Sequence, residues 1–107
     1  MNCPRNDVVL LPIPFTDLTS RKVRPAIVIG RNGMDLFVVP ISSVLANTDF
    51  RLKAWRAAGL NVPCGIKAQL ATVEERRVVK IVRKLATADL QSLNQRLRTW
   101  LKLQGTT

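Results

Sequence analysis

The fold is decided by one stretch of the sequence: Pro25-Ala26-Ile27-Val28-Ile29-Gly30, then Arg31-Asn32-Gly33-Met34, then Asp35-Leu36-Phe37-Val38-Val39-Pro40-Ile41. The two outer segments are short, rich in Val and Ile, and bounded by Gly or Pro, which is typical of β-strands. Asn-Gly between such segments is a strong hairpin signal, because both central residues of the favoured turn need a positive φ. We therefore predict an antiparallel hairpin with Asn32-Gly33 at its turn.

Further strands are expected on both sides of this hairpin. A strand at Asp7–Pro12 precedes it, and a polar loop from Pro14 to Val23 connects the two. Loops held by strands are where binding residues collect, so this loop is a candidate binding segment. Downstream we expect a strand at Phe50–Lys53, a short turn or helical segment that ends at Gly59, and strands near Ile66–Thr72 and Arg77–Val82.

The carboxy-terminal segment has the spacing of an amphipathic helix over Ala88–Leu103. Its apolar stripe consists of Leu90, Leu93, Leu97, Trp100 and Leu101. We expect this stripe to pack on the sheet, which must bury one face. Because 107 residues make one ordinary domain, we predict a single domain over residues 1–107. Its class is mostly β with added α: a small antiparallel β-barrel of about five to seven strands, capped by a carboxy-terminal helix.

The charge balance points to a phosphate-bearing partner. Lys and Arg number 17 against 7 Asp and Glu, a formal net charge of +10. A merely soluble basic surface or an acidic protein partner fits the same count. The sequence shows no secretory signature and no apolar run of membrane-spanning length, so we expect a cytoplasmic protein that binds no membrane. Cys3 and Cys64 stand in no metal-binding or redox spacing and are expected to be reduced thiols.

Absent residue types narrow the chemistry. The sequence has no His, which removes the usual general base, the usual zinc ligand and every Ser-His or Cys-His nucleophile pair. It has no Tyr, and its seven carboxylates never form a close pair with intervening ligands; Glu74 and Glu75 are neighbours that would point to opposite faces of a strand. We therefore expect no metal site and no cofactor, which disfavours a metal-dependent nuclease.

A series of short strings extends along nearly the whole chain. They are Phe15-Thr16-Asp17-Leu18, Arg24-Pro25-Ala26-Ile27-Val28-Ile29, Val39-Pro40-Ile41-Ser42, Gly59-Leu60 before Pro63, Ile66-Lys67-Ala68-Gln69-Leu70-Ala71-Thr72-Val73-Glu74, and Ala88-Asp89-Leu90. In their order and approximate spacing they resemble the MazF/PemK family of toxin endoribonucleases. The resemblance implies an SH3-like barrel of the CcdB/PemK type.

The chain departs from the family pattern at several positions. Asn6 and Val82 stand where Gly is usual or common, and Cys64 and Ala86 stand where Ser is. More serious for the chemistry, some members carry an Arg and an Asp on the strand that reads Ile66-Lys67-Ala68-Gln69 here. A carboxylate general base is therefore not carried over.

The resemblance implies the toxin of a type II toxin–antitoxin system, a metal-independent, sequence-specific endoribonuclease that cleaves single-stranded messenger RNA. The substrate's own 2′-OH attacks the adjacent phosphate and leaves a 2′,3′-cyclic phosphate and a 5′-OH. This chemistry needs in-line positioning and stabilisation of a negative phosphorane. The implied catalytic residues are Arg24, which grips two phosphate oxygens; Ser42, which reaches a phosphate oxygen or the 2′-OH; and Lys67, a phosphate ligand or proton donor.

The substrate-binding residues that follow from the same reading are Thr16, Arg21, Lys22, Ser43 and Gln69. Arg21 and Lys22 would follow the RNA backbone, Thr16 more readily shapes its own loop, and Ser43 is an alternative to Ser42. The basic run Glu74–Lys84 fits an extended RNA track and a solvated strand face equally well. Trp55 fits a core or dimer contact better than base stacking.

The implied partners are single-stranded RNA, a second copy of the chain in a homodimer, and an antitoxin whose acidic disordered tail occupies the RNA groove. Two alternatives stay open. One is a binding-only toxin with the same barrel that acts on DNA gyrase. The other is a degenerate member that binds without cutting, which the missing Asp at Ala68 keeps possible.

Overall fold

The predicted hairpin lies at the centre of a curled antiparallel sheet. The computed structural model describes residues 3–12 and 23–102, and all bounds refer to that part of the chain. Its strands are β1 (Asp7–Pro12), β2 (Val23–Asn32), β3 (Asp35–Ser42), β4 (Phe50–Arg51), β5 (Gly65–Ile66), β6 (Ala71–Glu74) and β7 (Lys80–Lys84). Two 3₁₀ turns, Leu45–Asn47 and Glu75–Arg77, and the helix α1 (Thr87–Trp100) complete the described elements.

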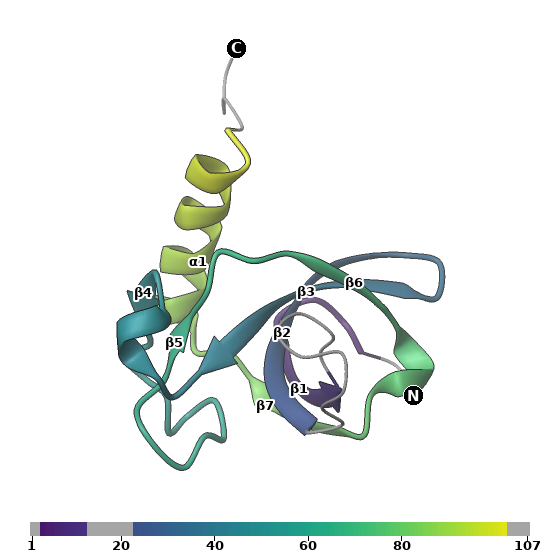
Figure 1. The fold of residues 1–107 in the computed structure, drawn as a ribbon, viewed down its shortest axis with the longest axis horizontal. Coiled ribbons are helices and arrows are strands. Elements are labelled where there is room, and N and C mark those ends of the chain that lie inside the picture. The colour runs from purple at the N-terminus through teal and green to yellow at the C-terminus, as the bar shows by residue number, and fades with distance from the viewer. Residues whose placement is uncertain (1–2, 13–22, 103–107) are drawn as a thin grey trace.

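The strands follow the order β4-β5-β3-β2-β1-β7, and β6 also pairs with β3. The first half of β3 pairs with β6 and its end pairs with β5. Figure 1 shows the sheet rolled into a barrel-like curl with α1 beside it. Among the described strands no ladder joins β6 to β7, so hydrogen bonds do not close the curl there. The predicted class, mostly β with one carboxy-terminal helix, is confirmed.

The central strands bury apolar side chains on both faces of the sheet. One core cluster contains Val8, Ile27 and Val39 together with Leu93 and Leu97 of α1. A second cluster contains their sequence neighbours Val9, Val28 and Val38. Successive side chains of a strand alternate between faces, so the continuous apolar runs of the sequence supply both cores. The stripe of α1 packs on the sheet as predicted, except that Leu101 is exposed.

The turn of the central hairpin differs from the prediction by one residue. Asn32 pairs with Asp35, so the central residues of the turn are Gly33 and Met34 rather than Asn32 and Gly33. Gly33 has a φ of +62°, whereas Asn32 and Met34 do not have a positive φ. A glycine with positive φ at the first central position is the arrangement of a type II′ turn.

Other predicted boundaries were wrong where backbone N–H groups bond to partners outside the sheet and interrupt a strand. The strand expected at Ile66–Thr72 is divided into β5 and β6 by a tight turn, in which the Gln69 N–H donates to the Lys67 carbonyl. β4 ends before Lys53, whose N–H donates to the Asp89 carboxylate instead of to a strand.

The last predicted strand and the helix also shift. The strand expected at Arg77–Val82 is β7, which starts at Lys80 because Glu75–Arg77 form a 3₁₀ turn. The helix expected at Ala88–Leu103 starts one residue earlier and ends at Trp100, and Leu103 lies outside the described residues.

Asn6 explains one departure from the family pattern. It has a φ of +80°, a conformation that glycine adopts freely and that Asn tolerates better than most residues. Its N–H donates to the Val28 carbonyl and its carbonyl accepts from the Leu85 N–H. Asn6 therefore fills a glycine-like position without losing the backbone bonds on either side.

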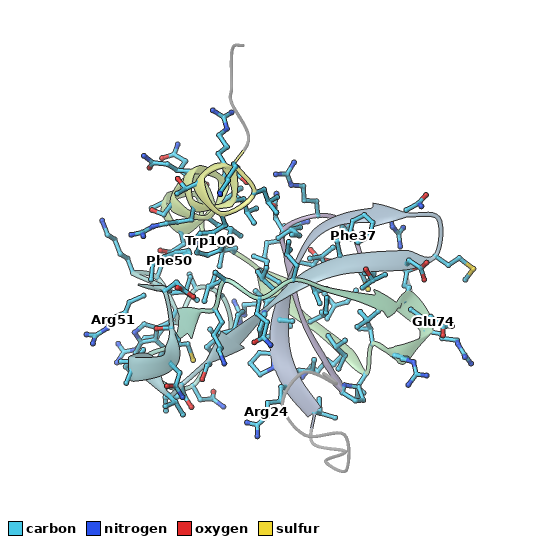
Figure 2. The ribbon with its side chains drawn as sticks, turned by 45° about the horizontal axis from the view of Figure 1, so that its top comes forward. Arg24, Phe37, Phe50, Arg51, Glu74 and Trp100 are labelled. Carbon is cyan, nitrogen blue, oxygen red and sulfur yellow. The ribbon has the colours of Figure 1, made fainter. Side chains whose placement is uncertain are left out.

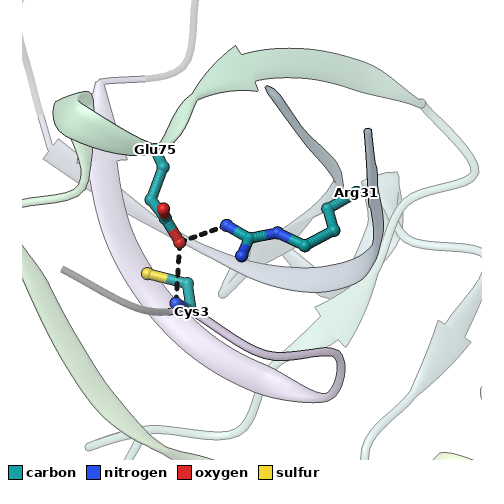
Figure 3. A network of polar contacts seen from close by, with 3 residues as sticks. All are labelled: Cys3, Arg31 and Glu75. Atoms are coloured by element: carbon teal, nitrogen blue, oxygen red, sulfur yellow. Dashed lines mark hydrogen bonds and ion pairs between the residues drawn. The ribbon is translucent and has the colours of Figure 1, made fainter. Parts of the chain in front are cut away.

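Glu75 contacts both Cys3 in the amino-terminal segment and Arg31 in β2 (Figure 3). Its carboxylate accepts a hydrogen bond from the Cys3 N–H at 2.8 Å and pairs with the guanidinium of Arg31. The backbone bond from Cys3, with the Arg31 contact, lowers the pKa of the Glu75 carboxyl. Its neighbour Glu74 pairs with Arg76 instead. The two adjacent carboxylates therefore have separate partners, although Glu75 lies in the 3₁₀ turn rather than in a strand.

Candidate nucleic-acid cleft

Strands β1, β2, β3 and β7 and the loop after Gly59 line a cleft of about 460 Å³. Arg24, Ser42 and Ser43, all predicted site residues, line it together. Lys80 joins them from β7. None of the described residues that line the cleft is Asp or Glu, so its charged side chains are cationic.

The register of β2 and β3 explains why Arg24 and Ser42 line the same cleft. Ala26 pairs with Pro40, and continuing that register by two residues puts Arg24 opposite Ser42. A β-bulge at Ile29 shifts the pairing by one residue between the hairpin turn and this end. Without that bulge, Arg24 would lie opposite Ser43. The continued register thus sets Ser42 rather than Ser43 opposite Arg24, although both serines line the cleft.

The register of β1 explains why Lys80 is present. Leu10 pairs with Pro25 of β2 on one side and with Lys80 of β7 on the other. The strands that carry Arg24 and Lys80 therefore flank the same residue of β1. A second β-bulge places Val82 without a partner between Ile81 and Arg83, and Val82 also lines the cleft.

The two cations of the cleft are not neutralised within the described chain. Arg24 is exposed at the foot of β2, and Figure 2 shows its side chain extending away from the sheet. Neither the Arg24 side chain nor the Lys80 side chain forms an ion pair or hydrogen bond with any residue that the structure describes. By contrast Lys84, on the same strand as Lys80, pairs with Asp7 at 3.1 Å. A site with such unneutralised positive charge favours the binding of an anion.

Ser42 is half-buried and held in one orientation. Its hydroxyl oxygen accepts a hydrogen bond from the Val44 N–H at 3.0 Å. This bond to the second following residue is typical of serine turns. Because a hydroxyl has one donor and two acceptor positions, Ser42 retains its O–H for a ligand in the cleft.

Lys67 and Gln69 do not line this cleft. The Lys67 N–H donates to the carbonyl of Pro40, two residues before Ser42, so its backbone lies beside the end of β3. The N–H of Ala68 donates to the carboxylate of Asp49. Thr16, Arg21 and Lys22 lie outside the described residues.

Sequence reasoning missed the role of Lys80 and of the loop that carries Leu60, Asn61 and Val62. Lys80 was visible only as one cation in the run Glu74–Lys84, whose other charged residues include four that form ion pairs. Asn61 and Val62 are exposed and line the cleft. The only sequence signal for this loop is its place between Gly59 and Pro63, which marks a turn but not a wall of a site.

Trp55 and Cys64 are structural in this fold. Trp55 is half-buried against the first core cluster, and the Arg56 guanidinium lies 4.8 Å from the centre of its ring. Cys64 reaches the cleft but is buried, and burial raises the pKa of its thiol. A protonated thiol is a poor nucleophile. Both cysteines are free, as expected.

A second cleft, of about 700 Å³, lies between α1 and the outer face of β2, β3 and β6. Phe37, Leu70 and Leu101 give it an apolar lining, with Arg5 and Arg98 among its charged residues. It contains none of the predicted site residues, so the smaller cleft is the candidate site. The described residues contain no group of three His, Cys, Asp or Glu side chains placed to hold a metal. No described helix is both long and apolar enough to cross a membrane.

Comparison with known proteins agrees with this fold. Residues 4–101 match the model of the PemK-like, MazF-like toxins of type II toxin–antitoxin systems. No curated protein sequence matches the chain. A solved mycobacterial endoribonuclease in complex with its cognate antitoxin superposes with a TM-score of 0.71 at 19% identity, covering 97% of this chain and 98% of that one.

Two further solved structures are similar. The Mycobacterium tuberculosis toxin MazF-mt6 gives a TM-score of 0.72 at 14% identity, with 92% of this chain and 98% of that chain covered. An endoribonuclease from a mycobacterial species gives 0.69 at 18% identity, with 96% and 95% covered. At these identities the likeness establishes a shared fold.

Proposed function

The chain belongs to the family of PemK-like, MazF-like toxins of type II toxin–antitoxin systems, and on this premise we propose that it is a metal-independent, sequence-specific endoribonuclease of single-stranded messenger RNA. One observation carries the proposal. Arg24 and Ser42 both line a cleft whose described lining has positive charge without an ion-pair partner and no carboxylate. Such a site binds phosphate and stabilises negative charge that develops on it.

The reaction that suits these residues is internal transfer of the phosphodiester. The 2′-oxygen forms a bond to phosphorus while the bond from phosphorus to the 5′-oxygen breaks, which leaves a 2′,3′-cyclic phosphate and a 5′-OH. The 2′-OH releases its proton and the departing 5′-oxygen takes one up, so no water is consumed. Arg24 stabilises the charge on the pentavalent phosphorane with two donors. Ser42 donates its O–H to a phosphate oxygen.

Sequence preference is assigned to the loop that carries Leu60, Asn61 and Val62. Its backbone is held at both ends: the Leu60 N–H donates to Trp55 and the Leu52 N–H donates to Cys64. The Asn61 side chain forms no hydrogen bond within the described chain. An amide offers both donors and an acceptor to a base edge. Apolar Leu60 and Val62 offer surface for the base itself.

The proposed partners and location follow from the family and the charge. An antitoxin with an acidic segment would complement the net charge of +10. The solved relative described as an endoribonuclease in complex with its cognate antitoxin supports this assignment. We also propose a homodimer of single-domain subunits in the cytoplasm. Lys67 and Gln69 are proposed to contact the same RNA outside this cleft, and Thr16, Arg21 and Lys22 are proposed to contact it as well.

The deciding experiment is to incubate the purified protein with a long single-stranded RNA in EDTA and to map the new ends. We expect discrete cuts that bear cyclic phosphates. Arg24→Ala should lower the rate by roughly 10²–10³, the loss typical of removing one charge-stabilising donor. Arg51→Ala is the matched control, because Arg51 is exposed on β4 and lines neither cleft. Intact RNA with the wild-type protein would reject nuclease activity and favour a binding-only or degenerate toxin.

A further inference from the structure

We propose that Lys80 is a second cationic ligand of the scissile phosphate, acting opposite Arg24; this inference rests on the proposed nuclease function. Its first support is electrostatic. The Lys80 side chain is exposed, lines the cleft and has no ion-pair or hydrogen-bond partner in the described chain. Lys84, four residues later on β7, is neutralised by Asp7. The two lysines of this strand therefore have different electrostatic environments, and only Lys80 offers its charge to the cleft.

The second support is the geometry of the sheet. Lys80 and Pro25 pair with opposite sides of Leu10. Neighbouring strands lie about 4.8 Å apart, so backbones two spacings apart are separated by roughly 10 Å. Lys80 and Arg24 both line the cleft, and side chains of this length reach one phosphate group across such a distance. Leu10, the strand partner of Lys80, lines the cleft as well. The apolar stem of a lysine packs readily on such a residue while its ammonium group stays free.

The third support is the small number of positive charges in the cleft. The phosphorane carries one negative charge more than the phosphodiester, and Arg24 is the only other cation among the described residues that line the site. Lys67, the second cation expected from the family pattern, does not line it. Lys80 therefore supplies the additional positive charge from a different strand. Its role is electrostatic, since it binds the phosphate oxygens and transfers no proton.

The test compares Lys80→Ala, Lys80→Arg and Lys53→Ala with the wild-type protein. Lys53 is an exposed lysine that lines neither cleft, and its hydrogen bond to Asp89 comes from the backbone. Single-turnover cleavage is measured with saturating protein on an RNA that contains a wild-type cut site. We expect Lys80→Ala to slow cleavage by roughly 10²-fold or more, Lys80→Arg to recover most of the rate, and Lys53→Ala to match wild type.

A binding measurement separates the scissile phosphate from its neighbours. The probe is the same RNA with 2′-O-methyl groups, which cannot be cut, prepared with and without a neutral methylphosphonate at the cut site. If Lys80 contacts that phosphate, Lys80→Ala and the methylphosphonate will weaken binding non-additively. The slope of log affinity against log salt will also fall by about 0.7 in Lys80→Ala.

The outcomes are distinguishable from failure of the proposed function. Wild-type cleavage with a Lys80→Ala rate equal to that of Lys53→Ala would overturn the inference and leave the nuclease intact. Additive binding effects would assign Lys80 to a neighbouring phosphate and also overturn it. A wild-type protein that binds the probe but cuts no RNA would reject the nuclease and with it any scissile phosphate. Thermal unfolding of each variant, and Lys80→Gln as a second neutral replacement, exclude loss of folding as the cause.

Discussion

The hydroxyl oxygen of Ser42 accepts a hydrogen bond from the backbone N–H of Val44, 3.0 Å away. This contact occupies one acceptor position of the hydroxyl and leaves its O–H able to donate to a ligand in the cleft. Ser42→Ala should therefore slow cleavage by roughly 10²-fold, because a donor to the developing oxyanion is lost. Ser42→Thr keeps the hydroxyl and should keep most of the activity. Cleavage rates at saturating RNA are the measurement.

The Ser43→Ala variant tests whether Ser42 or Ser43 acts in the cleavage step. The register across the bulge at Ile29 puts Ser42, not Ser43, opposite Arg24. We therefore expect Ser43→Ala to affect substrate affinity more than the cleavage step. A Ser43→Ala rate as low as that of Ser42→Ala would mean that the β2–β3 register does not govern the site.

Asn61→Ala should change which sequences are cut more than how fast they are cut. Asn61 is exposed at the cleft and forms no hydrogen bond in the described chain. Loss of a side chain that bonds a base edge typically costs about 1–3 kcal/mol of discrimination. Cut sites mapped on a long RNA pool provide the measurement, with Asn47→Ala as control because Asn47 is exposed and lines neither cleft. An unchanged set of cut sites would argue against a base-reading role for this loop.

Asp89→Asn should destabilise the protein. The Asp89 side chain is buried, and its two oxygens accept from the N–H groups of Lys53 and Ala54, each at 2.8 Å. An amide would turn its NH₂ toward one of these donors, and an unsatisfied buried donor costs about 1–3 kcal/mol. The urea midpoint should fall with an unchanged m-value. Asp35→Asn, on an exposed aspartate, should leave the midpoint nearly unchanged.

Ala86→Ser should stabilise the protein. Ala86 is the N-cap residue of α1 and provides no side-chain hydrogen bond to the helix start. A serine there accepts from a free N–H of the first turn, which is worth about 0.5–2 kcal/mol. Ala88→Ser, inside the first turn, lacks this benefit and should be neutral or slightly destabilising. Equal unfolding midpoints for Ala86→Ser and wild type would show that the cap does not form.

The Cys3–Glu75–Arg31 contacts predict an acid-sensitive stability. The folded protein lowers the pKa of the Glu75 carboxyl, chiefly through the Cys3 N–H. Its contribution is therefore complete above the unfolded-state pKa and is lost as pH falls through the folded-state pKa. Glu75→Gln should be less stable than wild type at neutral pH, and the difference should shrink in acid. Urea unfolding across that pH range measures it, and a constant difference would contradict the assignment.

Local sequence predicted most of the secondary structure but not its interruptions. The bounds of β1, the central hairpin and the packing face of α1 followed from apolar periodicity, which acts between near neighbours. The division of residues 65–74 into two strands and the early end of β4 did not follow. A tight turn at Lys67–Gln69 and the bond from Lys53 to Asp89 decide those boundaries. The early end of β4 depends on Asp89 in the distant helix α1, and no local sequence pattern reveals that contact.

The sequence by itself determined which side chains are available for catalysis and binding. It has a net charge of +10 and no His, and it places an arginine and a serine at the ends of two adjacent strands. Only the tertiary structure decided which side chains share the site. When the register is continued past the bulge at Ile29, Ser42 rather than Ser43 lies opposite Arg24, because one extra residue in β2 shifts the pairing beyond it by one residue. The pairing of β7 with β1 brings Lys80 to the same cleft from the other end of the chain. Strand pairing joins residues that are far apart in the sequence. The sequence therefore shows which cations are present, but not which side chains they lie beside.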